Sequence, residues 1–348
     1  MMEFFADYGL FLLQTLTIVL ALILVIALGS RISGGSNESK GAIKITDLSK
    51  KLADQTKQVA GVVDAALVEK QTSLIERLKK FFGKSSPKPE EKQSKKEKLA
   101  VIIEFRGDLK ASQVADLREE VSAILAMERK PDQVVLKLTS PGGLVHTYGL
   151  ASSQLSRLRD ANIPLCACVD TVAASGGYMM AVCADRIVSA PFAVLGSIGV
   201  VAQIPNIHRF LKNRDVDVEL HTAGANKRTL TLIGENTPEG RKKFKEDLEQ
   251  THALFKSWIA ARRPELDLDV VADGSIFYGT DALAKGLCDE IATSDDILMN
   301  LNVDHHLFGV KWVEKKSLAA RLGQDVSTAL VDQIDSYINR ADQDHTRL

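Results

Sequence analysis

The sequence predicts an α/β protein in which helices pack on a largely parallel sheet. From Leu99 onward, short apolar runs of β type alternate with helical patterns, as expected for that class. The 348 residues are long enough for one large domain or two ordinary ones. No repeat with a period of roughly 20 to 50 residues is present, so the pattern does not indicate a solenoid.

Composition excludes several classes of protein. The chain is 45% hydrophobic, which is too apolar for a wholly disordered protein. Its 44 Lys and Arg residues balance 45 Asp and Glu residues, so the clustered positive charge that nucleic-acid binding requires is not expected. Four cysteines without a CxxC pair or a zinc-type histidine spacing predict neither a disulfide scaffold nor a metal site.

The first predicted element is a transmembrane anchor within residues 1–30. No charged residue occurs between Asp7 and Arg31, which leaves 23 residues of mostly apolar sequence. A helix needs about 20 such residues to cross the hydrocarbon core of a bilayer. A cleaved signal peptide is the alternative, but its leading region would be positive, whereas Glu3 and Asp7 are negative.

An amphipathic helical region follows the anchor, over residues 31–83. Apolar residues at helical spacing predict a helix over 46–82: Leu48, Leu52, Val59, Val63, Leu67, Leu74, Leu78 and Phe81. This helix could be a juxtamembrane stalk, a membrane-surface helix, an oligomer contact or a helix packed on its own domain. Residues 84–98 form a charged linker, because they contain two prolines and no apolar residue.

The α/β domain is expected over residues 99–295, with a C-terminal helical extension over 296–348 that includes an amphipathic pattern at 316–340. The predicted strands are Leu99–Phe105, Gln133–Leu138, Leu165–Val169, Arg186–Ser189 and Val216–His221. The predicted helices are 112–128, 145–160, 176–184, 204–213 and 238–262. The last begins with Thr237 as N-cap and Pro238 at the first helical position.

Three glycine-rich turns, at 139–143, 173–178 and 195–200, are candidates for chemistry. Each alone could be a tight connection between a strand and a helix. In the second turn, Ser175 lies where a strand becomes a helix, so its hydroxyl and the Gly176 N–H would face the positive helix end. The Gly142-Gly143 pair could add a second donor, and preorganised donors stabilise a developing oxyanion. This arrangement indicates an acyl-transfer site with a serine nucleophile.

A serine nucleophile needs a base. The seven histidines show no supporting pattern, and the sequence has no GxSxG elbow. The other known solution is a lysine whose pKa is lowered by burial. Lys227 is a candidate because it follows a predicted strand and a glycine turn.

Taken together, these motifs resemble the S49 peptidases, the Ser–Lys proteases related to signal peptide peptidase A, and most closely their membrane-anchored SohB branch. The motifs are TSPGG at 139–143, AASGGYM at 173–179, GSIGV at 196–200 and AGANKRT at 223–229. Asp273–Gly279 and the following Ala282, Gly286, Leu287 and Asp289 resemble the late signature of the family. Two positions depart from the family pattern, Ala223 in place of a serine and Cys288 in place of a valine.

The resemblance implies a role for each candidate residue. It makes Ser175 the nucleophile and Lys227, 52 positions later, the general base. Ser197 would orient the lysine, and the Gly143 and Gly176 N–H groups would form the oxyanion hole. The implied fold is similar to the ClpP and crotonase folds, a spiral of ββα units that often assembles into homo-oligomeric rings.

The implied function is a membrane-anchored serine endopeptidase that works without a cofactor or metal. It would hydrolyse extended apolar peptides or unfolded proteins, such as signal-peptide or membrane-protein fragments, through an acyl-enzyme. Two alternatives remain open: an acyl-thioester enzyme of the same fold, and a catalytically inactive membrane scaffold. The first would need a CoA site and acidic catalytic residues, and a serine-directed acylating probe would label Ser175 only in the protease. The complete set of Ser175, Lys227 and Ser197 argues against the second.

The expected location is a bacterial inner membrane, crossed once. Positive residues follow the predicted span and none precedes it, and this charge bias favours a cytoplasmic catalytic domain. Members of the S49 family often act on the periplasmic side instead, so the sequence leaves both sides of the membrane open.

Overall fold

The computed structural model describes residues 9, 13–17, 19, 41–79, 98–224 and 226–314, with side chains omitted for 64–79. The chain divides into two units: Ile43–Trp312, and the residues before and after it. Most of the predicted anchor and linker, and the whole amphipathic pattern at 316–340, lie outside the described residues. Among the described residues, no helix combines the length and the apolar character needed to cross a bilayer.

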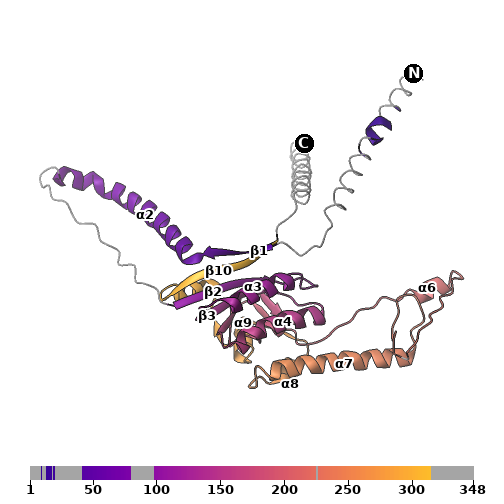
Figure 1. The fold of residues 1–348 in the computed structure, drawn as a ribbon. Helices are drawn as coiled ribbons and strands as arrows, with labels where there is room; N and C mark the ends of the chain where they lie inside the picture. Colours follow the sequence, from indigo (N-terminus) through magenta and orange to yellow (C-terminus); the bar gives the residue numbers. More distant parts are fainter. Residues whose placement is uncertain are drawn as a thin grey trace, which may run out of the picture. The chain divides into compact units, whose positions relative to one another are not determined.

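The main sheet has seven strands in the order β1-β10-β2-β3-β4-β6-β9 (Figure 1). Every pairing from β10 to β9 is parallel, which confirms the expected largely parallel sheet. The strands are β1 Gly41–Asp47, β2 Lys98–Arg106, β3 Gln133–Thr139, β4 Leu165–Val169, β6 Arg186–Ser189, β9 Glu290–Ile291 and β10 His305–Glu314. Four of these agree closely with strands predicted from the sequence.

A smaller sheet, in the order β5-β7-β8, carries the glycine-rich turns. Its strands are β5 Val172–Ala174, β7 Val194–Gly196 and β8 Ile276–Tyr278. β5 and β7 are parallel, and β7 and β8 are antiparallel. An isolated bridge between Ser140 and Ala173 connects the segment after β3 to this sheet, so the turns that follow β3, β5 and β7 converge.

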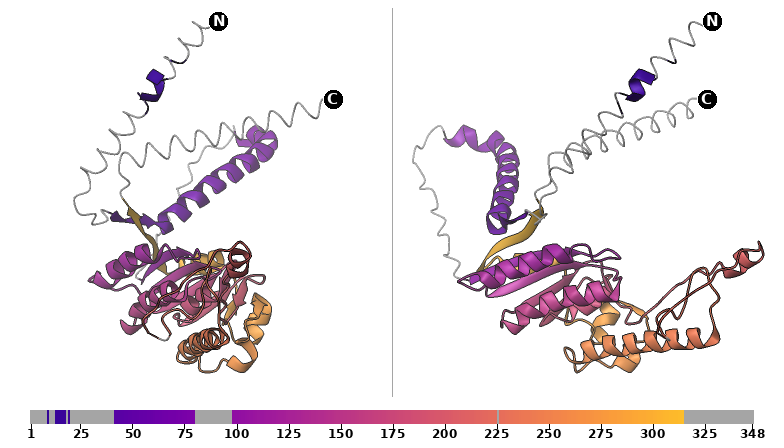
Figure 2. Two further views of the ribbon diagram at one scale, coloured as in Figure 1. Left: turned by 90° about the vertical axis from the view of Figure 1, so that its right-hand side faces the viewer. Right: turned by 45° about the vertical axis from the view of Figure 1, so that its right-hand side comes forward.

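Helices cover both faces of the main sheet (Figure 2). The helices are α2 Leu48–Lys79, α3 Val114–Ala126, α4 Val145–Asp160, α5 Gly176–Ala181, α6 His208–Lys212, α7 Pro238–Ala260, α8 Leu268–Val271, α9 Gly279–Ala284 and α10 Ser294–Leu301. Successive residues of β2 are buried in different clusters. Ile103 packs in the core that includes Leu117 of α3, whereas Ile102 packs in the one that includes Ile297 of α10. Burial on both faces explains why these strands are apolar without alternation.

Two expectations from the sequence are wrong. Val216–His221 is irregular rather than a strand, and its Val216 and Leu220 are about half exposed. An apolar run of β type forms a strand only where another strand pairs with it, and this run lies in the long connection between β7 and α7. Residues 305–314 form β10, within the region expected to be a helical extension, and pair with the edge of β2.

Candidate active site

Ser175 lies in a strained turn between β5 and α5. Its φ of 51° and ψ of −117° are unfavourable for any residue with a Cβ. The turn is held in place because the Ser175 N–H donates to the Gly196 carbonyl at 2.8 Å. Strain of this kind costs on the order of 1–3 kcal/mol and concentrates at functional sites. The sequence prediction that Ser175 lies where a strand becomes a helix is confirmed.

The turn at 139–143 lies directly against the Ser175 turn. A Cβ added to Gly142 would be 2.7 Å from the Gly176 nitrogen and 2.8 Å from the Ser175 Cβ, so only glycine fits. Gly142 also has a φ of +89°, which glycine adopts at little cost. In the described part of the chain, no hydrogen bond uses the N–H of Gly143 or Gly176. Both donors are therefore available beside the Ser175 side chain.

Ser197 follows β7 in the same way that Ser175 follows β5. It has a φ of 50°, and its N–H donates to the Ser275 carbonyl at 2.7 Å. Ser275 belongs to a turn closed by Asp273, whose carboxylate accepts from the Ser275 N–H at 2.8 Å. Hydrogen bonds from Ser275 hold the pKa of Asp273 below its usual value, so this carboxylate is ionised near neutral pH.

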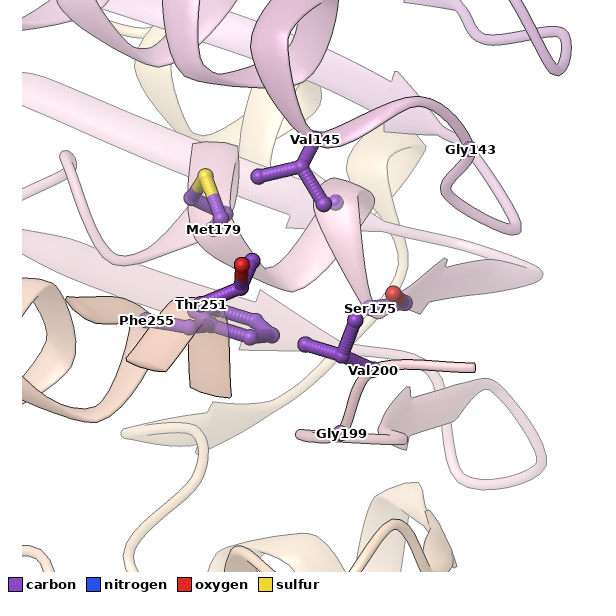
Figure 3. Close-up of a pocket in the computed structure, with 9 residues that line it drawn as sticks. Gly143, Val145, Ser175, Met179, Gly199, Val200, Thr251 and Phe255 are labelled. Carbon is purple, nitrogen blue, oxygen red and sulfur yellow. The ribbon is translucent and has the colours of Figure 1, made fainter. Parts of the chain in front are cut away.

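These turns line one hollow, which we term the catalytic cleft. Its volume is about 670 Å³, and Ser175, Gly143, Ser197, His252 and Asp273 all contribute to its wall. The close-up in Figure 3 shows Ser175 between the loop of Gly143 and the segment of Gly199 and Val200. The structure thus brings together four of the five residues predicted for the site, because Gly176 lines the adjoining hollow with Ser175.

An apolar pocket of about 730 Å³ adjoins the cleft. Its wall comes mainly from α4, α5 and α7, and the apolar side chains that form it are Val145, Met179, Val200, Leu248, Leu254, Phe255 and Trp258. Val145, Met179, Thr251 and Phe255 also face the small hollow beside Ser175 in Figure 3. A chain bound along this wall would place apolar groups next to the Ser175 hydroxyl.

Lys227 does not line the catalytic cleft. It is exposed, and it lines none of the described hollows that include Ser175. Lys227 belongs to the segment 201–237 between β7 and α7, which we term the arm, and Figure 1 shows α6 at the far end of the arm, away from the sheet. The two legs of the arm meet where the Ile207 N–H donates to the Leu232 carbonyl at 2.8 Å, and Lys227 lies in the loop beyond that contact.

Sequence reasoning missed two side chains of the site. His252 of α7 lines the catalytic cleft, and its Nε2 is 3.2 Å from the Ile198 carbonyl, so it carries the proton and donates to that carbonyl. Tyr148 of α4 is fully buried behind the two glycine turns. Neither had a motif to mark it, because each reaches the site only through tertiary packing.

Two family models match consecutive parts of the chain. The model described as Peptidase family S49 N-terminal matches residues 3–155, and Peptidase family S49 matches residues 157–307. A probable protease SohB of Haemophilus influenzae is 43% identical over 98% of this chain and 98% of its own length. A probable protease SohB of Buchnera aphidicola is 50% identical over 70% of this chain and 72% of its own length.

A solved structure is also similar. It is a mutant of a 1510-N membrane-bound stomatin-specific protease in complex with a substrate peptide. The sequence identity is 12%, the TM-score is 0.38, and the match covers 66% of this chain and 98% of that chain.

Proposed function

This chain belongs to peptidase family S49, as a serine peptidase of the SohB branch, and from that premise we propose that it cleaves peptides with a Ser175–Lys227 dyad. The observation that carries the proposal is the turn at Ser175, which is strained, lies beside a cleft and has the unused Gly143 and Gly176 N–H groups around it. The succession of strands and helices is also compatible with the spiral of ββα units that we propose for the fold.

The proposed reaction proceeds through an acyl-enzyme. The neutral amine of Lys227 takes the proton of Ser175 as the serine oxygen attacks the scissile carbonyl carbon. The carbonyl oxygen becomes an oxyanion that the Gly143 and Gly176 N–H groups stabilise. The Lys227 ammonium then protonates the leaving amine as the peptide C–N bond breaks. Finally, water gives a proton to Lys227 as its oxygen attacks the acyl carbon. The Lys227 ammonium returns that proton to the Ser175 oxygen as the ester C–O bond breaks, which releases the acid and restores Ser175 and the neutral amine.

We propose that a second copy of the chain supplies Lys227. A lysine exposed on an extended arm is solvated, whereas a base must be desolvated for its neutral form to be favoured. The arm also exposes many apolar side chains, which indicates a surface that another protein covers. These side chains are Val201, Ile204, Ile207, Phe210, Val216, Leu220, Leu232 and Ile233, each at least 40% exposed. Packing of the arm on a neighbouring copy would bury them and carry Lys227 to the cleft beside Ser175.

The proposed substrates are extended apolar peptides or unfolded proteins. The apolar pocket beside Ser175 favours apolar side chains, and the proposed reaction needs no cofactor or metal. The single-pass anchor at residues 1–30 remains part of the proposal and would hold the cleft near a bacterial inner membrane, where signal-peptide and membrane-protein fragments accumulate. The charge bias around the anchor favours a cytoplasmic cleft, whereas the family favours a periplasmic one.

A fluorophosphonate probe and an apolar fluorogenic peptide test the proposal on the full-length chain in membranes. We expect the probe to label the wild-type protein and not S175A, and we expect K227A to lose labelling and turnover. An H252Q variant separates the two candidate bases of the cleft. We expect H252Q to retain measurable turnover, and loss of turnover in H252Q together with normal turnover in K227A would refute the dyad.

A further inference from the structure

A chain of three hydrogen bonds runs behind the two glycine turns. The Gly142 N–H is 3.1 Å from the Ser140 Oγ, which is 2.7 Å from the Tyr148 hydroxyl oxygen. The Tyr148 hydroxyl in turn is 2.8 Å from the Asp108 carbonyl oxygen. Ser140 and Tyr148 are both fully buried, so water does not compete for the two bonds that Ser140 makes, and the bond from Tyr148 to the exposed Asp108 is partly buried.

The chemistry of the groups fixes the direction of every bond. A carbonyl oxygen can only accept, so the single hydroxyl proton of Tyr148 points to Asp108. Tyr148 must then accept from Ser140, and Ser140 must accept from the Gly142 N–H. Burial raises the pKa of Tyr148, so its hydroxyl keeps the proton that the chain needs. Each of the three hydrogen bonds therefore has one possible donor and one possible acceptor, which makes this series of hydrogen bonds rigid.

The aromatic ring of Tyr148 supports the second glycine turn. A Cβ added to Gly176 would collide with this ring, so the Gly176 backbone lies directly on it. The ring itself is fixed by an edge-on contact with Phe105, with centroids 6.4 Å apart. One residue thus touches the backbone that carries one proposed oxyanion donor and is hydrogen-bonded to the turn that carries the other.

The Asp108 end of this series of hydrogen bonds is also connected to Gly143, through the neighbouring residue Leu109. The next carbonyl, that of Leu109, accepts from the Leu144 N–H at 2.9 Å. A Cβ on Gly143 would collide with the same Leu109 carbonyl. Because the Tyr148 hydroxyl holds the Asp108 carbonyl, it also holds the backbone against which Gly143 is packed.

We propose that Tyr148 is a positioning residue that sets the distance between the Gly143 and Gly176 donors of the oxyanion hole. It acts through Ser140 and Asp108 on one donor and through its ring on the other, and it does not touch the substrate. This inference rests on the proposed function, since it concerns the same site. An N–H donor that is displaced from its position no longer stabilises the oxyanion of the transition state well, whereas the affinity for the substrate changes little.

Y148F tests this role, because it removes only the hydroxyl and keeps the ring. We expect kcat to fall by roughly tenfold to a hundredfold with KM within about twofold, as for a lost transition-state interaction. Affinity for a peptide aldehyde, whose adduct with a serine carries an oxyanion, should fall by a similar factor. S140A should have the same effect, and the Y148F/S140A double variant should be no worse than either, because one break disables the chain.

Tyr178 provides a matched control. It is also fully buried, and its hydroxyl donates to a backbone carbonyl, that of Leu287, at 3.0 Å. A purely structural role would make Y148F and Y178F lose thermal stability and activity alike. Y148F with wild-type kcat and aldehyde affinity, or Y178F with the same loss of kcat as Y148F, would overturn the inference. A wild-type protein that neither cleaves peptide nor reacts with the fluorophosphonate would instead refute the proposed function, whatever Y148F does.

Discussion

Ser175 and Ser197 are the residues that immediately follow a pair of parallel strands in register. Ala174 of β5 is the partner of Gly196 of β7, and the chain then turns at both serines with φ near 50°. The parallel pairing fixes the spacing of the two turns, so their relation does not depend on flexible loops. This register explains why two short glycine motifs, whose serines are 22 positions apart, lie at one site.

The register leads to a prediction for Ser197. S197A should lower kcat by roughly tenfold to a hundredfold. Lys227 becomes an ammonium as Ser175 attacks, and a hydrogen bond from that charged group to the Ser197 hydroxyl oxygen contributes about 1.5–3 kcal/mol. Alanine at this φ is about as strained as serine, so the change isolates the hydroxyl. Steady-state kinetics with the apolar peptide measure the effect. S257A on α7 is the control, since the hydroxyl of that exposed serine donates to the Ala253 carbonyl of its own helix. Equal activities of S197A and S257A would contradict the prediction.

Supply of Lys227 by a second copy predicts complementation between two inactive variants. S175A retains the lysine and K227A retains the serine, so coexpression of differently tagged chains should restore up to roughly a quarter of the wild-type sites in a mixed assembly. The fluorophosphonate should label only the K227A chain of the mixture. Each variant expressed alone is the control. A mixture that stays inactive while the two tags copurify would show that the dyad does not form between copies.

Gly142 is a position at which the turn at 139–143 tolerates no side chain. G142A forces a Cβ to within 2.7 Å of the Gly176 nitrogen and strains a backbone with positive φ. We expect kcat to fall by about 10²–10³, as when one oxyanion donor is lost, with a smaller change in KM. G61A is the control, because a Cβ on that helical glycine of α2 meets nothing within 4 Å. Comparable kcat values for G142A and G61A would exclude a tight turn at 142.

The strands of the main sheet could be predicted because burial on both faces makes them apolar. Leu165–Val169 and Arg186–Ser189 have the same bounds in the sequence prediction and in the structure. The glycine turns could be predicted because a close approach between backbone segments and a positive φ both require glycine, which is visible in the sequence. The helix after Thr237 could be predicted because the cap is local, with the Thr237 hydroxyl accepting from the Gly240 N–H at 3.0 Å.

Other features depend on packing that no local pattern records. β5 and β7 have three residues each, too few for a periodic signal, and β10 pairs with β2 across some two hundred residues of chain. The exposed run at Val216–His221 has the composition of a strand, so it was predicted wrongly. Tyr148 and His252 come to lie beside the site only when α4 and α7 pack against the turns.

Glu120 of α3 gives a prediction about stability. It is 4% exposed, and its carboxyl accepts from the Trp312 N–H at 2.8 Å, next to the end of the described β10. Burial raises the pKa of Glu120 from 4.5 to about 7, and the neighbouring Asp116 contributes to the increase. The folded protein therefore binds one more proton than the unfolded chain between these values. The contribution of Glu120 to the free energy of unfolding should therefore be most favourable below pH 4.5 and should decline as the pH rises to 7.

E120Q should remove that decline, because the amide keeps the size and the acceptor of the carboxyl group without the charge. At pH 8 the free energy of unfolding of E120Q should exceed that of the wild type by up to about 3 kcal/mol, and the gain should shrink towards pH 5. Urea unfolding of the full-length chain at both pH values measures the difference. E119Q changes the exposed neighbour and should alter stability by no more than about 0.5 kcal/mol at either pH. If the stability of the wild type instead rises from pH 5 to pH 8 relative to that of E120Q, the Glu120 carboxylate is ionised in the folded protein and a positively charged group neutralises it.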